Sequence, residues 1–410
     1  MSKVLRHNKL NQVEAAKKIA EEGFERTVLS FYKYVRIKDP EKTRNLLFEQ
    51  WEGLSVLGRV YVAKEGINAQ VSVPDFNLAV FKALVSEVPY FKGLDFKEAI
   101  EKNNYSFFKL TIKVKDQIVA DGLKPSDYDV TNPGKHINAK EWNELMDNGA
   151  IVVDMRNHYE SEVGHFNGAI LPGSVTFKEE LPLVKNLLSG KENEKVLLYC
   201  TGGIRCEKAS AYLKNEGFKG VHQLSGGIVR YAQQVKESGL ENKFKGKNFV
   251  FDNRLGERVS NDIISNCHQC GQKSDNHTNC ANLNCNLLFI QCGDCKKKTK
   301  NCCSPACLET TLLSEEEQKK LGSPDHWLNN LQQLGSAVAS LGEGLTGIVK
   351  QLKPAGKSGV TSKKWVRPEP EPSNTAESEP ELSTSTEAKP ESTPETTPAT
   401  SAPESEGEAR

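Results

Sequence analysis

The sequence contains no apolar run long enough to cross a membrane, for which about 20 consecutive apolar residues are needed. Its start, "MSKVLRHNKLNQVEAAKK", also lacks the hydrophobic core of a secretory signal peptide. We therefore expect a cytoplasmic protein that has no membrane partner.

The sequence also lacks a net charge, because 54 Lys and Arg balance 54 Asp and Glu. This balance hides an asymmetry: from Arg367 onward, eleven Glu stand against Arg367, Lys389 and Arg410, which gives that segment a net charge of −8. The remainder therefore carries +8. Such an excess permits an anionic partner without proving one, since many lysine-rich faces are only solvated.

Cysteine is plentiful, with 11 residues, and a reducing compartment leaves thiols free for metal binding or catalysis. Cys200 and Cys206 stand apart, whereas the other nine lie between Cys267 and Cys307. The two groups are therefore expected to have different roles.

The length of 410 residues predicts two or three domains at about 150 residues each. Residues 27–115 show the order strand, helix, strand, strand, helix, strand, which is typical of a ferredoxin-like α+β sandwich. Its central hairpin is expected to turn near "KEGIN", where Gly66 suits a tight turn. We assign residues 1–120 to this domain and 121–136, rich in turn formers, to a linker. One face of such a sheet can bind nucleic acid, but a purely structural domain is an equal alternative.

The remaining segments differ in composition. Residues 137–240 alternate short apolar runs with helical stretches, which predicts an α/β domain with a parallel sheet. Residues 241–310 hold the cysteine-rich module, and 311–353 carry the apolar repeat of an amphipathic helical segment. Residues 354–410 are rich in Pro, Glu, Ser and Thr, which predicts a disordered acidic tail.

The stretch "LLYCTGGIRCEKAS" places Cys200 where a strand ends and a helix begins. Gly202 and Gly203 allow successive backbone N–H groups to turn inward, and the helix adds the positive end of its dipole. Arg205 adds a fixed positive charge, so the pKa of Cys200 is expected to be low enough for a nucleophile at neutral pH. The loop formed by Thr201, Gly202, Gly203 and Ile204 is shorter than the loop of cysteine phosphatases and suits a sulfur atom better than a phosphate. A buried, inert thiol is the less favoured alternative.

Cys206 shares a helical face with Ala209 and Leu213. This position favours packing over a resolving thiol that would form a disulfide with Cys200 or accept sulfur from it.

The nine clustered cysteines favour zinc. Cys267 with Cys270, and Cys292 with Cys295, form two C-x-x-C pairs of the kind that closes a tetrahedral zinc site. The candidate ligands are Cys267, Cys270, Cys280, Cys285, Cys292, Cys295, Cys302, Cys303 and Cys307, with His268 and His277 nearby. They could supply two structural zinc sites, although spacing does not give the pairing, and disulfides or an iron–sulfur cluster are less favoured alternatives.

The segments "DMRNHYESEVGHFNGAI", "YCTGGIRCEKAS" and "LSGGI" resemble the successive signature segments of the rhodanese domain. This resemblance implies that Cys200 carries a persulfide. It also implies that Asp154, Arg156, His165 and Gly168 are mainly structural supports.

With "GRVYVAKEGINAQVSV" before that domain and "FVFDNRLGERVS" after it, the chain resembles the bacterial tRNA uridine(34) hydroxylase family over residues 25–310. The resemblance implies oxygen-dependent conversion of the wobble uridine of tRNA to 5-hydroxyuridine, with Cys200 as the catalytic residue. The residues themselves do not explain how oxygen is activated, because no set of two histidines and a carboxylate and no nucleotide or flavin motif can be assigned.

Two alternatives are a thiosulfate-type sulfurtransferase and a non-enzymatic RNA-binding adaptor. The predicted RNA contacts are Lys64 near the hairpin turn, Arg254 in "FDNRLGER", and Lys296, Lys297 and Lys298 after the second C-x-x-C pair. The sequence does not indicate an oligomeric state.

Overall fold

The computed structural model describes residues 12–124, 126–314 and 316–318. Most of the predicted helical segment at 311–353, and all of the predicted acidic tail at 354–410, lie outside the described residues. No helix of the described part is long and apolar enough to span a bilayer.

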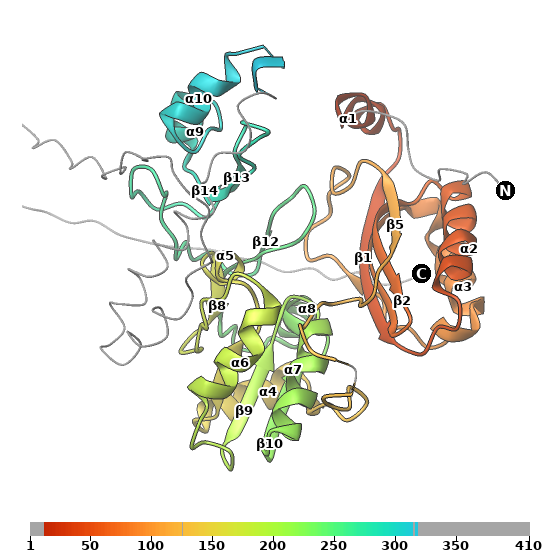
Figure 1. Cartoon of the computed structure of the whole chain (residues 1–410), viewed down its shortest axis with the longest axis vertical. Helices are drawn as coiled ribbons and strands as arrows, with labels where there is room; N and C mark the ends of the chain where they lie inside the picture. The colour runs from red at the N-terminus through yellow and green to blue at the C-terminus, as the bar shows by residue number, and fades with distance from the viewer. Residues whose placement is uncertain (1–11, 125, 315, 319–410) are drawn as a thin grey trace, which may run out of the picture. The chain divides into compact units, whose positions relative to one another are not determined.

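The first domain is a five-stranded sheet with helices on one face (Figure 1). After helix α1 (Gln12–Ala20), its elements are β1 (Arg26–Tyr34), α2 (Pro40–Gly53), β2 (Leu57–Ala63), β3 (Gly66–Pro74), η1 (Asp75–Asn77), α3 (Leu78–Glu87), η2 (Pro89–Phe91), β4 (Lys97–Glu98) and β5 (Leu110–Val114). The strand order β4-β1-β3-β2-β5 contains the antiparallel β4-β1-β3-β2 arrangement predicted for a ferredoxin-like domain. Two strands follow α3 where one was predicted: β5 lies where the predicted final strand ends but pairs in parallel with β2, and the two-residue β4 takes the place beside β1.

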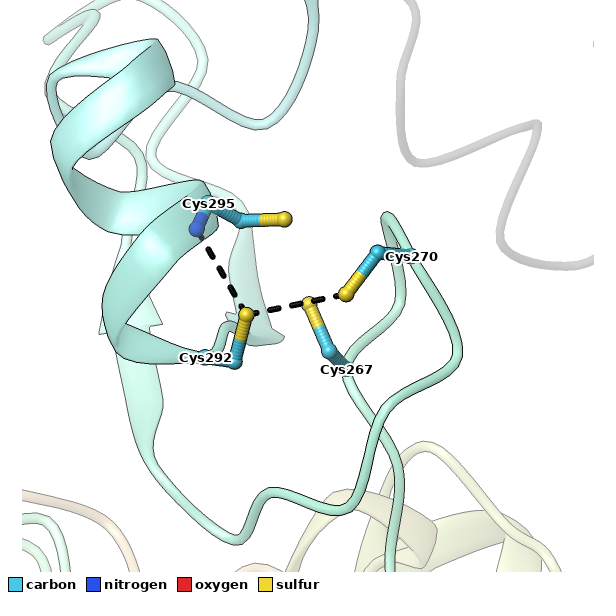
Figure 2. A group of neighbouring side chains, drawn as sticks. All are labelled: Cys267, Cys270, Cys292 and Cys295. Atoms are coloured by element: carbon cyan, nitrogen blue, oxygen red, sulfur yellow. Dashed lines mark hydrogen bonds between the residues drawn. The ribbon is translucent and has the colours of Figure 1, made fainter.

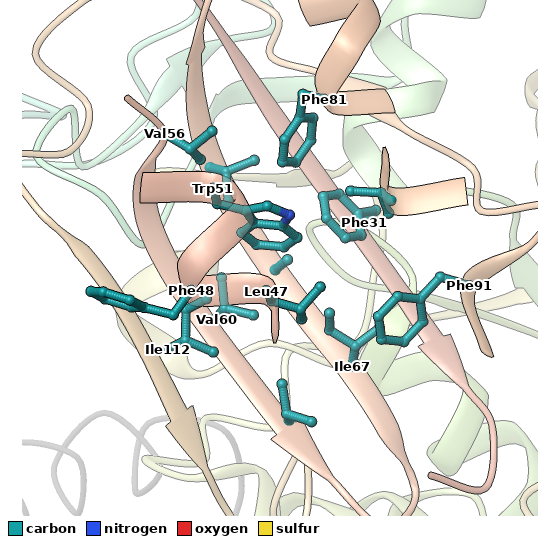
Figure 3. Close-up of a cluster of buried hydrophobic side chains, with 14 of the residues drawn as sticks. Phe31, Leu47, Phe48, Trp51, Val56, Val60, Ile67, Phe81, Phe91 and Ile112 are labelled. Atoms are coloured by element: carbon teal, nitrogen blue, oxygen red, sulfur yellow. The ribbon is translucent and has the colours of Figure 1, made fainter. Parts of the chain in front are cut away.

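The core of this domain lies between the sheet and helices α2 and α3 (Figure 3). Trp51 of α2 has no exposed surface and meets Phe81 of α3 edge-on, with ring centroids 5.1 Å apart. Helix α2 begins at Pro40 because the Asp39 side chain accepts a hydrogen bond from the Lys42 N–H and because proline is favoured in the first turn of a helix. The opposite face of the sheet is left for other contacts.

The predicted hairpin joins β2 and β3 through a two-residue turn at Lys64 and Glu65. Gly66 has φ +147°, and a Cβ atom there would lie 2.0 Å from the Lys33 carbonyl oxygen. Only glycine permits this approach of two backbones.

The second domain has the predicted parallel sheet, with strand order β6-β10-β9-β7. Its elements are β6 (Lys135–Ile137), α4 (Ala139–Asp147), β7 (Ile151–Asp154), α5 (His158–Ser161), β8 (Gly164–Phe166), α6 (Phe177–Leu187), β9 (Lys195–Tyr199), α7 (Ile204–Asn215), β10 (Gly220–Leu224) and α8 (Gly227–Ser238). Strand β6 begins at Lys135, inside the stretch assigned to the linker.

The last segment of the described chain contains the elements β11 (Phe244–Asn248), β12 (Glu257–Arg258), β13 (His277–Asn279), β14 (Leu288–Ile290), α9 (Gly293–Thr299) and α10 (Pro305–Thr311). Its first two strands form a small sheet with β8, in the order β12-β11-β8, and the cysteine-rich module follows this sheet. Because β11 pairs with β8 of the second domain, this sheet connects the module to that domain.

Candidate functional site

Cys200 lies directly after β9, at the carboxyl edge of the parallel sheet, where α/β proteins place their ligands. The Gly203 N–H donates a hydrogen bond to the Cys200 Sγ at 3.2 Å. Gly203 precedes α7 with φ +98°, a conformation that side chains rarely adopt. The loop therefore directs a backbone donor at the sulfur, as the glycine pair predicted.

Four neighbouring groups favour ionisation of Cys200. Complete burial raises the pKa of its thiol, but the Cys206 thiol, the Arg205 guanidinium and the backbone N–H groups of Cys206 and Arg205 outweigh burial. Together they lower the pKa of Cys200 from 9.0 to about 6. At neutral pH the sulfur is therefore mainly a thiolate, which is the nucleophilic form.

Arg205 is held by a carboxylate that sequence reasoning missed. Its two terminal nitrogens donate to the two oxygens of Glu160, at 2.6 and 2.8 Å, and Glu160 has no exposed surface. Glu160 lies on α5 and is separated from Arg205 by 45 positions, so spacing could not reveal the pair. The pair fixes Arg205 as a stationary positive charge beside the loop.

The residues expected to be structural supports lie at or near the strands that lead to the cysteine loop. Asp154 and Arg156 form a fully buried ion pair at 2.7 Å, and the Tyr199 hydroxyl donates to Asp154 at 2.7 Å. The Arg156 side chain also donates to the Gly164 carbonyl at 2.6 Å. This network links β7, β8 and β9, so it fixes the strand end from which Cys200 emerges. Nearby, a ring nitrogen of His165 lies 2.8 Å from the Ser161 carbonyl, and Gly168 has φ +71°.

Cys206 is buried in the same hydrophobic cluster as Cys200, Ala209 and Leu213. Burial, reinforced by the nearby Cys200 sulfur, raises the pKa of Cys206 well above its ordinary value. The thiol therefore packs in the core and also donates to Cys200, and the resolving role stays a prediction.

A cavity of about 400 Å³ lies between the cysteine loop and the helix-free face of the first domain's sheet. Cys200, Thr201, Gly202 and Arg205 line one side. From the sheet come Ser30, Tyr32, Arg59, Tyr61, Asn68 and Gln70, and from the segment after β11 come Phe251, Asp252 and Arg254. Cys200 is itself fully buried, so its thiol lies in the wall of this cavity rather than at an open surface. The remainder of the lining is mostly aliphatic, with the aromatic rings and neutral amides set among these apolar side chains.

Two residues of the first domain reach the cysteine loop. The Tyr32 hydroxyl donates to Glu207 at 2.8 Å and would lie 2.9 Å from a Cβ atom at Gly203. The Lys97 ammonium lies 4.8 Å from the Tyr32 ring centroid, and the residue is only 3% exposed. Burial lowers the pKa of Lys97, against the opposing effect of Asp95 and of the Cys200 thiolate. Sequence reasoning missed both residues, because alternating polar positions on a strand look like an ordinary solvated face.

The predicted RNA contacts are dispersed. Lys64 is exposed in the β2–β3 turn and lines neither of the two cavities described in this article. The Arg254 guanidinium is buried between Asp252 and Glu257, so its charge is already compensated. Lys296, Lys297 and Lys298 are exposed on α9. All five stay predictions, and the buried pairing of Arg254 does not favour a phosphate contact.

Eight of the nine clustered cysteines form two sets of four. Cys267, Cys270, Cys292 and Cys295 form one set, and Cys280, Cys285, Cys303 and Cys307 the other. Within each set all sulfur atoms lie within 4.8 Å of one another, and Figure 2 shows the first set converging on a common point. The Cys270 and Cys292 sulfurs are 3.6 Å apart, close to the edge of about 3.8 Å expected for a tetrahedron with zinc–sulfur bonds of about 2.3 Å. Both sets therefore fit a closed tetrahedral metal site.

Cys302 differs from the other candidate ligands. It belongs to neither set, and its sulfur lies 4.0 Å from the Thr311 hydroxyl. Burial raises the pKa of this thiol. The geometry therefore indicates a packed cysteine here rather than a metal ligand.

Three family models match the chain. The UPF0176 acylphosphatase like domain matches residues 26–118, the Rhodanese-like domain 138–234, and the Rhodanase C-terminal model 245–308. These matches agree with the two folds and the cysteine-rich module described above.

Curated relatives match over most of the chain. It is 53% identical to the tRNA uridine(34) hydroxylase of Leptospira interrogans, across 77% of this chain and 86% of that protein. It is 49% identical to the protein of the same name from Photorhabdus laumondii, across 76% of this chain and 90% of that protein.

Among solved structures, the Rhodanese-like domain of an Anabaena protein is 18% identical, with a TM-score of 0.22, and covers 28% of this chain and 80% of that one. A rhodanese-related protein from Thermoplasma volcanium is 23% identical, with a TM-score of 0.21, and covers 24% of this chain and 92% of that one.

Proposed function

This chain belongs to the tRNA uridine(34) hydroxylase family, and we propose that it hydroxylates the wobble uridine of tRNA in a reaction that depends on Cys200. The product is 5-hydroxyuridine, and molecular oxygen is the proposed co-substrate. The enzyme is thus an oxidoreductase whose substrate is a single nucleoside within a folded RNA.

One observation carries this proposal: the reactive cysteine lines a cavity whose other wall is the sheet of the first domain. Enzymes that modify a base draw it out of its stack into a pocket, where aromatic side chains stack on it and polar groups bind its edge. Tyr32, Tyr61 and Phe251 provide aromatic surface in this cavity, and Asn68 and Gln70 provide amide donors and acceptors. These groups suit a pyrimidine base.

The chemistry at Cys200 has two possible forms. In the first, the thiolate adds to C6 of the uracil, the S–C6 bond forms, and the C5=C6 electron pair moves to the C4 oxygen as an enolate. This addition makes C5 electron-rich, so that it can form a bond to dioxygen, the proposed oxidant. Two electrons from an external thiol reduce the second oxygen atom to water, and loss of the C5 proton and of the thiolate from C6 restores the C5=C6 bond. In the second, a persulfide on Cys200 takes part in the oxidation. Both forms need the thiolate that Arg205 and the loop stabilise.

We propose zinc as the metal of the two four-cysteine sets, with a structural role. All four ligands in each set are thiolate donors, and such closed sites leave no position for a substrate. Zinc would supply the cross-link that holds this small module folded. The proposed compartment is the cytoplasm, which fits a tRNA substrate and free thiols.

Sulfur transfer is the second candidate function. The match of the Rhodanese-like domain to residues 138–234 favours it, as does the Gly203 N–H that faces the Cys200 sulfur. A sulfurtransferase should form a stable persulfide on Cys200 when it reacts with thiosulfate, and it should consume thiosulfate in the absence of RNA.

The test is an assay of the purified full chain with unmodified tRNA, in air and under nitrogen. We expect 5-hydroxyuridine, measured by mass spectrometry of digested tRNA, only in air and only with an intact Cys200. Turnover of thiosulfate without any tRNA product would instead support the sulfurtransferase.

A further inference from the structure

A second cavity, of about 440 Å³, lies next to the first one. The segment 251–256 separates them: Phe251 and Asp252 line the first cavity, Asn253, Leu255 and Gly256 line the second, and Arg254 lines both. Leu255 has φ +56°, a conformation that non-glycine residues adopt rarely and that marks functional segments. The two cavities therefore lie on opposite sides of one short segment, close enough for neighbouring nucleotides of one RNA chain to enter them separately.

The lining of the second cavity is polar, but little of its charge is free. The Lys247 ammonium pairs with Asp275 at 2.9 Å, and Arg254 is paired with Asp252 and Glu257. Lys296, at the start of the exposed lysine run of α9, also lines the cavity, and its ammonium enters no ion pair within the described part of the chain. A cavity with one free cation is a poor site for an isolated phosphate group.

Amide side chains dominate the remainder of the lining. They come from the segment 251–256, from β13 and its approach, and from either end of α9: Asn253, Asn276, Asn279, Gln291 and Asn301. Gln291 is 1% exposed, and its Oε1 atom has no hydrogen-bond partner among the described residues, nor does the Oδ1 atom of Asn301. Buried amide oxygens without partners are rare. These two oxygens are buried behind the cavity wall, whereas the side chains of Asn253 and Asn279 line the cavity and offer both amide donors and acceptors.

We infer that this cavity is a subsite for an unpaired nucleobase adjacent to the modified uridine in the RNA chain. This inference rests on the proposed function and adds to it a site at which the protein recognises the identity of a neighbouring nucleotide in the RNA. Neutral amides that both donate and accept match the edge of a base, which is how proteins read single-stranded RNA. Lys296 of α9 lines the cavity and contacts the phosphate that joins the two nucleotides.

The test is a thermodynamic cycle between the protein and the RNA. The RNA is a synthetic anticodon stem-loop with uridine at the wobble position, intact or with an abasic site at one of the two neighbouring positions. The proteins are the full chain, the double variant Asn253→Ala/Asn279→Ala, and Asn148→Ala as a matched exposed asparagine, which lies at the C-cap of α4 and outside both cavities. The dissociation constant is measured by fluorescence anisotropy, and zinc content is measured to show that the cysteine-rich module is intact.

For the wild type and Asn148→Ala, we expect one of the two abasic sites to weaken binding about tenfold. The double variant should bind the intact RNA about tenfold more weakly and lose nothing further with that abasic RNA. Independent, additive effects at both positions would overturn the subsite while leaving the proposed function in place. If the wild type does not bind the intact stem-loop at all, the proposed function falls as well.

Discussion

Arg205 and Glu160 form a buried, two-point ion pair, with distances of 2.6 and 2.8 Å. Arg205 therefore acts on Cys200 as a fixed charge rather than as a mobile arm that grips a ligand. Moving the Arg205 guanidinium away from Glu160 would leave the Glu160 carboxylate buried and unpaired, which costs about 3–5 kcal/mol of stability in comparable pairs.

The first prediction concerns the substitution Arg205→Met. Removing the positive charge should move the pKa of Cys200 upward from about 6, because the Coulombic attraction of Arg205 lowers it. The thiolate is populated above that pKa and lost below it, so the whole reactivity profile should move to higher pH. The measurement is the rate of Cys200 alkylation by iodoacetamide against pH, followed by peptide mass spectrometry.

Arg205→Lys provides the control for charge. It keeps the cation but loses the two-point contact, so its profile should stay nearer to that of the wild type. An unchanged midpoint in a folded Arg205→Met protein would show that the loop alone sets the acidity of Cys200.

The second prediction separates the two loop glycines. Gly203→Ala forces a side chain onto φ +98° and against the Tyr32 hydroxyl, whereas a Cβ atom at Gly202 meets nothing within 4 Å. The first change should therefore displace the N–H that faces Cys200, slow its alkylation at pH 7 about tenfold and abolish hydroxylation. Gly202→Ala is the matched control and should keep the fast alkylation. Equal rates for the two variants would contradict the role assigned to Gly203.

The third prediction tests the contribution of the first domain. Because the Cys200 thiolate favours the charged form of Lys97, the Lys97 ammonium must in turn favour the thiolate. Lys97→Met should raise the alkylation midpoint of Cys200 and reduce hydroxylation, and Lys97→Arg should restore part of both. Lys82→Met, at a partly exposed lysine paired with Glu98 on the same domain, should change neither. If Lys97→Met leaves the midpoint unmoved while activity falls, Lys97 acts on the substrate instead.

The fourth prediction concerns metal content. Two four-cysteine sets predict two zinc ions per chain, measured by plasma mass spectrometry of the purified protein. Cys292→Ser should lower the content to about one, since one of the four ligands is lost. Cys302→Ser should leave it at about two, because Cys302 belongs to neither set. Loss of zinc from Cys302→Ser to the same degree would contradict the division described here.

Sequence patterns located the elements whose signal is local. Alternation and helical spacing predicted the sandwich of the first domain. The short apolar runs predicted the parallel sheet, including the strand that ends directly before Cys200. A final strand before Lys115 was predicted, but its parallel pairing with β2 was not, and β4 has only two residues, which is too short to show alternation.

The site was harder to predict, because its partners meet only in three dimensions. The Tyr32 hydroxyl and Glu207 are separated by 175 positions, and nothing in spacing or composition joins them. Glu160 and Lys97 are also distant from Cys200 along the chain. Spacing likewise could not show that Cys302 stands outside a metal set, since it directly precedes Cys303.

The central claim is that hydroxylation of the wobble uridine depends on Cys200, which lines a cavity between the second domain and the sheet of the first. The most direct test is mass spectrometry of tRNA nucleosides from cells that lack this activity and carry either the wild-type chain or Cys200→Ser. We predict that 5-hydroxyuridine and its derivatives return with the wild type and stay absent with Cys200→Ser. Restoration of the nucleoside by Cys200→Ser would contradict the account.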